Sequence, residues 1–205
     1  MDTTLPQTVL DRVVEHLVGV PGVAALALGG SRGRGDARPD ADVDVGLTYR
    51  AEALDLAALD GALRELDDAH RPGLLNSPGA WGPWVNGGAW TRVTGLPVDI
   101  LLREAGRVEA VVRDCLAGRI TIDYQAGHPF GFVNAIYAAE VHFCRPLWQH
   151  ASRPLDALKA LLHSEGEYPP RMRAALSGRF LWEAEFSLAT GRKAALGGDV
   201  HYAMG

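Results

Sequence analysis

The chain has 205 residues, with 20 Lys and Arg against 25 Asp and Glu, which gives a formal net charge of −5. This length fits one large domain or two small ones, and hydrophobic residues at 47% with charged residues at 22% exclude a disordered chain. The acidic balance disfavours a nucleic-acid partner, because a nucleic-acid surface needs an excess of Lys and Arg.

The two cysteines, Cys115 and Cys144, lie far apart and form no CxxC pattern. A disulfide framework or a structural zinc site is therefore not expected, and a reducing cytosol is the natural compartment. Residues 1–4 lack the basic start and apolar run of a signal peptide. The longest uncharged stretch, residues 72–91, is rich in Gly and Pro, so we expect a loop there and no membrane contact. The expected location is the cytoplasm.

The first elements are marked by apolar spacing. Helical periodicity predicts a helix with Pro6 in its first turn and Gly19 at its end. The continuous apolar run 23–28 predicts a strand buried on both faces. Residues 29–35 are too rich in glycine for a helix or a strand, and strict alternation over 42–47 predicts a second strand.

The pattern changes near residue 105. Before it we expect a helix over 52–68 and strands over 89–93 and 96–102. After it we expect a helix from 108 to 116, a short strand over 120–124, and helices over 132–144, 155–163 and 170–190. This predicts two parts, residues 1–105 with mixed helices and strands and residues 106–205 mostly helical.

The sequence Gly29-Gly30-Ser31 follows the buried strand. Glycines there let backbone N–H groups approach a phosphate closely, and the serine hydroxyl adds a donor. Neither GxxxxGK[ST] nor GxGxxG occurs in the chain. Taken alone, these residues fit a plain turn between a strand and a helix equally well.

Asp42 and Asp44 belong to the second predicted strand. Residues two apart on a strand face the same way, so their carboxylates project together, roughly 6–7 Å apart at the backbone. Such a pair is costly without a cation between its members, and ligands that are all oxygen favour Mg²⁺ or Mn²⁺ over zinc. The alternative is a solvated edge strand, which the burial required by Val43, Val45 and Leu47 disfavours.

Asp99 lies in the apolar strand predicted over 96–102. A carboxylate in such a strand must be paired, protonated or liganded. If this strand lies beside the one that carries Asp42 and Asp44, then Asp99 completes a triad of carboxylates on one face of the sheet. A core aspartate that is hydrogen-bonded to backbone remains the alternative.

Gly29-Gly30-Ser31, a ten-residue spacer, Asp42-x-Asp44 and the later Asp99 together resemble the nucleotidyltransferase superfamily of the DNA polymerase β type. Residues 30–44 look like its minimal and antibiotic-modifying branches. The resemblance implies an α+β fold, with a mixed β-sheet flanked by helices and followed by a mostly helical C-terminal domain. The chain departs from the family in two respects. Gly33 stands where the family usually has Ala, and this glycine would loosen the turn after Ser31. The helical half of the chain is also short for the family.

The resemblance also implies an activity. A nucleoside monophosphate, expected to be AMP from ATP, would pass to a hydroxyl of a small molecule, for example an aminoglycoside-like one, with release of pyrophosphate. Asp42 and Asp44 would hold two Mg²⁺ ions (or Mn²⁺) about 3.5–4 Å apart. Asp99 would bind the metal on the acceptor side and could accept the proton of the acceptor hydroxyl.

The same resemblance implies a nucleotide site. Gly29, Gly30 and Ser31 would bind the terminal phosphates, and Arg32 or Arg34 would neutralise their charge. Arginines beside a glycine-rich loop are equally often only solvated, so both interpretations of these two residues stay open.

Two other functions remain open at this point. One is a minimal nucleotidyltransferase of toxin–antitoxin type that adenylylates a partner protein, and the other is a catalytically silent nucleotide-binding module. A homodimer, in which a second subunit completes the substrate pocket, is also compatible with the short helical half.

Several residues of the chain permit two interpretations. Glu140 or His142 could be a base on the acceptor side, although a solvated helix face is the more common use of such residues. Trp81, Trp84 and Trp90 could stack on a flat substrate, although core packing is the more common use of tryptophan.

Overall fold

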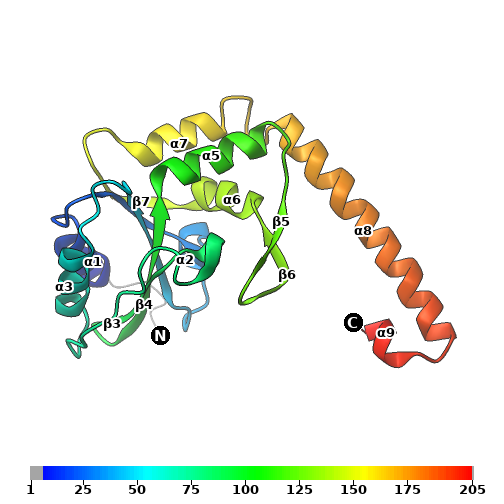
Figure 1. Ribbon diagram of the computed structural model, residues 1–205, viewed down its shortest axis with the longest axis horizontal. Coiled ribbons are helices and arrows are strands. Elements are labelled where there is room, and N and C mark those ends of the chain that lie inside the picture. The colour runs from blue at the N-terminus through cyan, green and yellow to red at the C-terminus, as the bar shows by residue number, and fades with distance from the viewer. Residues whose placement is uncertain (1–6, 205) are drawn as a thin grey trace.

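The computed structural model describes residues 7–204 (Figure 1), so the expected role of Pro6 lies outside the described residues. Its centre is a five-stranded mixed sheet in the order β3-β4-β2-β1-β7. The strands are β1 (Val23–Leu28), β2 (Val43–Tyr49), β3 (Gly88–Val93), β4 (Leu96–Glu104) and β7 (Arg145–Gln149). Strands β2 and β4 run parallel, and the other neighbours are antiparallel.

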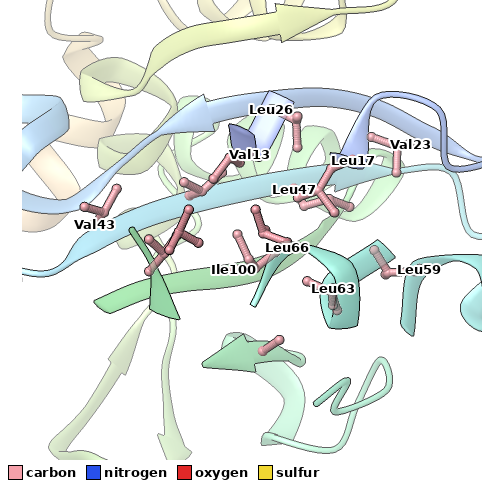
Figure 2. Close-up of a cluster of buried hydrophobic side chains, with 14 of the residues drawn as sticks. Val13, Leu17, Val23, Leu26, Val43, Leu47, Leu59, Leu63, Leu66 and Ile100 are labelled. Carbon is pink, nitrogen blue, oxygen red and sulfur yellow. The ribbon is translucent and has the colours of Figure 1, made fainter. Parts of the chain in front are cut away.

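Helices α1 (Gln7–Leu17) and α3 (Leu56–Leu66) pack against each other and cover one face of the sheet. The alternation in β2 puts Val43, Val45 and Leu47 on this face, where each is fully buried or nearly so. Figure 2 shows Val43 and Leu47 together with labelled side chains of α1, β1, α3 and β4 in one apolar core, to which Val45 also belongs. The opposite face of the sheet, called the open face below, carries the intervening polar residues of β2 and β4.

A second group of elements lies over part of the open face. It contains α5 (Ala105–Leu116), α6 (Ala135–Phe143), α7 (Pro154–Leu162) and the hairpin of β5 (Ile122–Gln125) with β6 (His128–Val133). Its buried core includes Trp84, from the short helix α4 (Gly82–Val85), stacked on Phe132. Leu155 of α7 packs on Ala25 and Ala27 of β1, so this group is joined to the sheet by apolar contact.

Four local expectations were wrong. Residues 29–35 contain the short helix α2 (Gly30–Arg34), which Gly35 ends by adopting φ +86° while its N–H bonds to the Ser31 carbonyl. The stretch 72–91, expected as a loop up to the strand predicted over 89–93, also contains the short helix α4, whereas that strand forms as β3. The segment expected as a helix from 132 begins as β6, and the second half also contributes β7. Strand β7 forms because the exposed edge of β1 offers backbone partners that no local pattern reveals.

The chain continues into the long helix α8 (Pro170–Leu196) and then α9 (Val200–Met204). Figure 1 shows α8 running away from the rest of the molecule, and Met172 near its start is its buried residue. Large apolar side chains are exposed along α8: Phe180, Leu181, Trp182, Phe186, Leu188 and Leu196. Within residues 7–204, none of the helices combines the length and the apolar character needed to span a bilayer.

Candidate active site

Three aspartates meet at one end of the open face. Asp44 on β2 and Asp99 on β4 are directly paired in the parallel ladder, which puts both side chains on the same face. Asp42 lies just before β2. One carboxylate oxygen from each of the three lies within 4.8 Å of the others. The sequence placed the residues of this triad on two strands, and the register of the strands brings them together.

The triad concentrates negative charge in a partly buried place. Burial, with the nearby carboxylates of Asp42 and Asp44, raises the pKa of Asp99 to about 6. Burial also raises the pKa of Asp44, with Asp42 and Glu140 adding to the effect. Carboxylates at such spacing are stabilised by a cation, and an all-oxygen donor set suits a hard divalent metal ion. The three residues could therefore hold such an ion.

Gly30 lies in close contact with the Asp44 carboxylate. A Cβ at position 30 would lie 1.8 Å from Oδ2 of Asp44, and the backbone of Gly30 has φ +54°. Both facts require glycine. The preceding N–H of Gly29 donates to the backbone carbonyl of Asp44 at 2.8 Å, so the glycine turn is fixed to the strand that carries the carboxylate.

Gly33 lies in the helical turn that follows, close to the end of β1. The N–H of Gly33 donates to the Gly29 carbonyl at 2.6 Å, so the turn forms despite the glycine. A Cβ at position 33 would lie 2.8 Å from the carbonyl oxygen of Leu28, and backbone cannot move aside as a flexible side chain could. This contact accounts for glycine at position 33, where the resemblance described above implies Ala.

The two arginines of the turn do different things. Arg32 donates through Nε to the Asp42 carbonyl at 2.9 Å and through Nη2 to the Ala41 carbonyl at 2.5 Å, so it holds the segment that presents Asp42. Arg34 contacts Asp36 at 3.1 Å and lines a cavity together with Gly29 and Gly30. Arg34 is therefore the arginine placed toward the glycine turn.

The family model described as "Nucleotidyltransferase domain" matches residues 9–120, which include the glycine turn and all three aspartates. The chain belongs to this family. No curated protein matches the chain. It is a nucleotidyltransferase, and its fold, a mixed sheet flanked by helices with a mostly helical C-terminal part, is the one expected from the motif.

The nucleotidyltransferase has a cavity of about 360 Å³ between the open face and α6, next to Asp44. Its wall contains an ion pair that the sequence did not reveal. Arg103, which is buried, donates to both carboxylate oxygens of Glu140, each at 2.8 Å. The pair joins β4 to α6 across 37 positions. The sequence feature that could have indicated this ion pair is Arg103 itself, a charged residue directly after the apolar run of β4.

Of the three tryptophans in the glycine-rich segment, Trp84 belongs to the core, and Trp81 and Trp90 lie beside the triad. Trp84 is buried and stacked on Phe132, as core packing predicts. Trp90 is opposite Asp99 in the β3–β4 ladder and 60% exposed, and Trp81 stacks on it. A tryptophan pair beside the triad was visible in the sequence only as one of two interpretations.

Proposed function

We propose that this nucleotidyltransferase moves AMP from ATP to a hydroxyl of a small molecule and releases pyrophosphate. The observation that carries the proposal is the arrangement of Asp42, Asp44 and Asp99 within 4.8 Å beside the glycine turn. The net charge of −5 and the cluster of carboxylates suit a cationic acceptor such as an aminoglycoside-like compound.

The residues fit a divalent metal centre. All three donors are carboxylates, and burial together with the neighbouring negative charges raises the pKa of Asp44 and Asp99, so a cation at this place would stabilise the charged carboxylates. We assign Asp42, Asp44 and Asp99 as ligands of two Mg²⁺ ions, with Mn²⁺ as a substitute. When bound, these ions would supply positive charge to the phosphate oxygens during transfer.

The protein's own groups would position the reactants. The backbone N–H groups of Gly30 and Ser31 and the Ser31 hydroxyl would bind the terminal phosphates, with Arg34 adding positive charge, and Gly29 would shape the turn through its bond to the Asp44 carbonyl. Arg32 would act indirectly, since it holds the backbone of Asp42.

In the transfer itself, the acceptor oxygen bonds to the α-phosphorus while the bond from that phosphorus to the bridging oxygen breaks. Pyrophosphate leaves with the electron pair of that bond. Asp99, which lies on the acceptor side of the triad, would accept the hydroxyl proton.

The decisive experiment incubates the protein with α-labelled ATP and Mg²⁺ and follows the label. Transfer to a small hydroxyl compound supports the proposal. A mass gain on a polypeptide after dialysis of small molecules would instead favour adenylylation of a partner protein. Nucleotide binding without pyrophosphate release would identify a silent module. GTP, CTP and UTP in parallel reactions test the choice of ATP.

We propose that the protein works in the cytosol, because nucleoside triphosphates are abundant there and the free thiols of Cys115 and Cys144 stay reduced.

We also propose that two copies of the chain associate through α8. Leu181 and Leu188 lie on one side of this helix and Trp182 and Phe186 on another, all at least half exposed. A helix that is apolar on more than one side is normally buried. A second copy offers the same pattern, so that an antiparallel pair is self-complementary.

A further inference from the structure

Two tryptophan rings lie stacked on the open face of β3, the edge strand next to Asp99. Trp90 faces Asp99 across the β3–β4 ladder, so the two side chains leave the sheet on the same side. The ring centroids of Trp81 and Trp90 are 4.6 Å apart and their planes differ by 23°. Trp81 also covers Gly88 of the same strand, where an added Cβ would lie 3.0 Å from its ring.

Hydrogen bonds hold the backbone at both tryptophans, while the Trp90 side chain is open to solvent. The Trp81 carbonyl accepts a hydrogen bond from Gln125 at 2.6 Å, and the Trp90 carbonyl accepts one from Arg71 at 3.1 Å. Nevertheless Trp90 is 60% exposed, whereas Trp84 from the same segment is 9% exposed. An exposed indole stacked on a second indole beside a polar site can bind the flat or apolar face of a ring.

The strand order places this pair on the acceptor side of the site. From β1 to β3 the open face carries the glycine turn, then Asp44, then Asp99, then Trp90. In phosphoryl-type transfer the attacking and leaving oxygens lie roughly in line on opposite sides of the phosphorus. If pyrophosphate leaves on the glycine turn, as the proposed function requires, the acceptor arrives from the β4–β3 side and meets Trp90.

We propose that Trp90 and Trp81 form the acceptor subsite of this nucleotidyltransferase, and that it binds a hydroxylated sugar or cyclitol ring. This inference rests on the proposed function, because it assigns the other half of the same transfer. The C–H face of the ring stacks on the indole of Trp90. Directly paired residues on neighbouring strands have Cβ atoms about 5 Å apart, so a hydroxyl of the stacked ring reaches the Asp99 carboxylate. Trp90 therefore determines which acceptors are used.

The test measures acceptor kinetics with the full chain, Mg²⁺ and α-labelled ATP. The acceptors are glucosamine, methyl glucoside and myo-inositol as rings, glycerol and serine amide as open chains, and tyrosine amide as an aromatic hydroxyl. We expect transfer to rings. Trp90→Ala should raise the acceptor KM by about tenfold or more while kcat and the KM for ATP change less than about twofold. Trp90→Phe should recover most of the affinity, because it keeps an aromatic face.

The matched control is Trp182→Ala. Trp182 is also an exposed tryptophan stacked on a second aromatic ring, Phe186, but it lies on α8 and not beside the triad. This variant should leave the acceptor KM unchanged, which separates the role of Trp90 from the general effect of losing an exposed, stacked indole.

A second readout requires no transfer. With 5-fluorotryptophan incorporated, the fluorine resonance that disappears in Trp90→Phe should shift on addition of glucosamine or myo-inositol and stay in place with glycerol. The inference is overturned if Trp90→Ala transfers to rings with the wild-type KM, if tyrosine amide is accepted and sugars are not, or if no ring compound shifts the Trp90 resonance. The proposed function fails separately, if the wild-type protein releases no pyrophosphate although sugars still shift that resonance.

Discussion

At the scale of single residues, the site depends on a close contact between a carboxylate and a glycine. The Asp44 carboxylate occupies the space that any side chain at position 30 would need. The same glycine begins the turn whose next residue is Ser31. The position of the carboxylate and the shape of the turn are therefore one feature of the molecule.

Gly30→Ala should reduce nucleotidyl transfer at least about 100-fold, because a displacement of the Asp44 carboxylate by an ångström misplaces the reacting groups. The positive φ at this position should also lower the free energy of unfolding by about 1 kcal/mol. Steady-state rates of pyrophosphate release and urea denaturation measure the two effects.

Gly35→Ala is the control for this substitution. Gly35 has φ +86° in the same turn, but nothing lies within 4 Å of its added Cβ. It should lower stability by a similar amount, about 1 kcal/mol, and leave the rate of transfer nearly unchanged. Equal losses of activity in both variants would show that backbone strain, and not contact with Asp44, explains the glycine at position 30.

At the scale of elements, the buried Arg103 connects strand β4 to helix α6 through Glu140. The guanidinium also donates to the carbonyls of Val85 and Leu102, so it makes four hydrogen bonds in all. Because the pair spans the cavity beside Asp44, it fixes how α6 lies over the open face. Glu140 is thus a positioning residue that holds two elements together.

Glu140→Gln should lower the free energy of unfolding by about 2 kcal/mol, because it leaves a buried guanidinium without its countercharge. The exposed pair of Glu109 and Arg113, four positions apart on α5, offers the matched control. Glu109→Gln should change stability by less than about 0.5 kcal/mol. Urea denaturation measures the free energy of unfolding of both variants. Equal losses in Glu140→Gln and Glu109→Gln would contradict the structural role given to Glu140.

The elements that sequence patterns predicted well are those whose own residues determine them. The apolar run of β1 and the alternation of β2 specify burial locally, and both strands form where expected. Strand β7 is different, because Pro146 disfavours a regular strand and only the edge of β1 gives its backbone partners.

The same distinction holds for the site. The triad could be anticipated from the alternation of Asp42 and Asp44 and from one carboxylate in an apolar strand. The ion pair of Arg103 with Glu140, and the stacking of Trp81 on Trp90, depend on how separate segments meet in three dimensions. No local pattern encodes such contacts.

At the scale of the whole molecule, two apolar cores divide the chain. One is built from α1, α3 and the sheet, and the other from α5, α6, α7 and their neighbours. Strand β7 comes from the second half of the sequence but belongs to the sheet of the first. The boundary near residue 105 stays a prediction, and the long helix α8 lies outside both cores for most of its length.

If α8 joins two copies, wild-type protein should sediment at twice the mass of one chain, and Phe186→Arg should sediment as a single chain. A charge on the apolar side of α8 cannot be buried without a partner, so it should oppose association. Ser187→Arg adds the same charge on another side of the helix and should leave the dimer intact. Single-chain sedimentation of the wild-type protein at high concentration would contradict this association.

The account as a whole requires that the three aspartates act together on a nucleoside triphosphate. The most direct measurement is Mg²⁺-dependent release of pyrophosphate from ATP by wild type, Asp44→Asn and the control Asp40→Asn, an exposed carboxylate of the same loop. We predict release by wild type and Asp40→Asn, and a loss of at least about 1,000-fold in Asp44→Asn, with unchanged folding. Wild-type turnover in Asp44→Asn would contradict the carboxylate site.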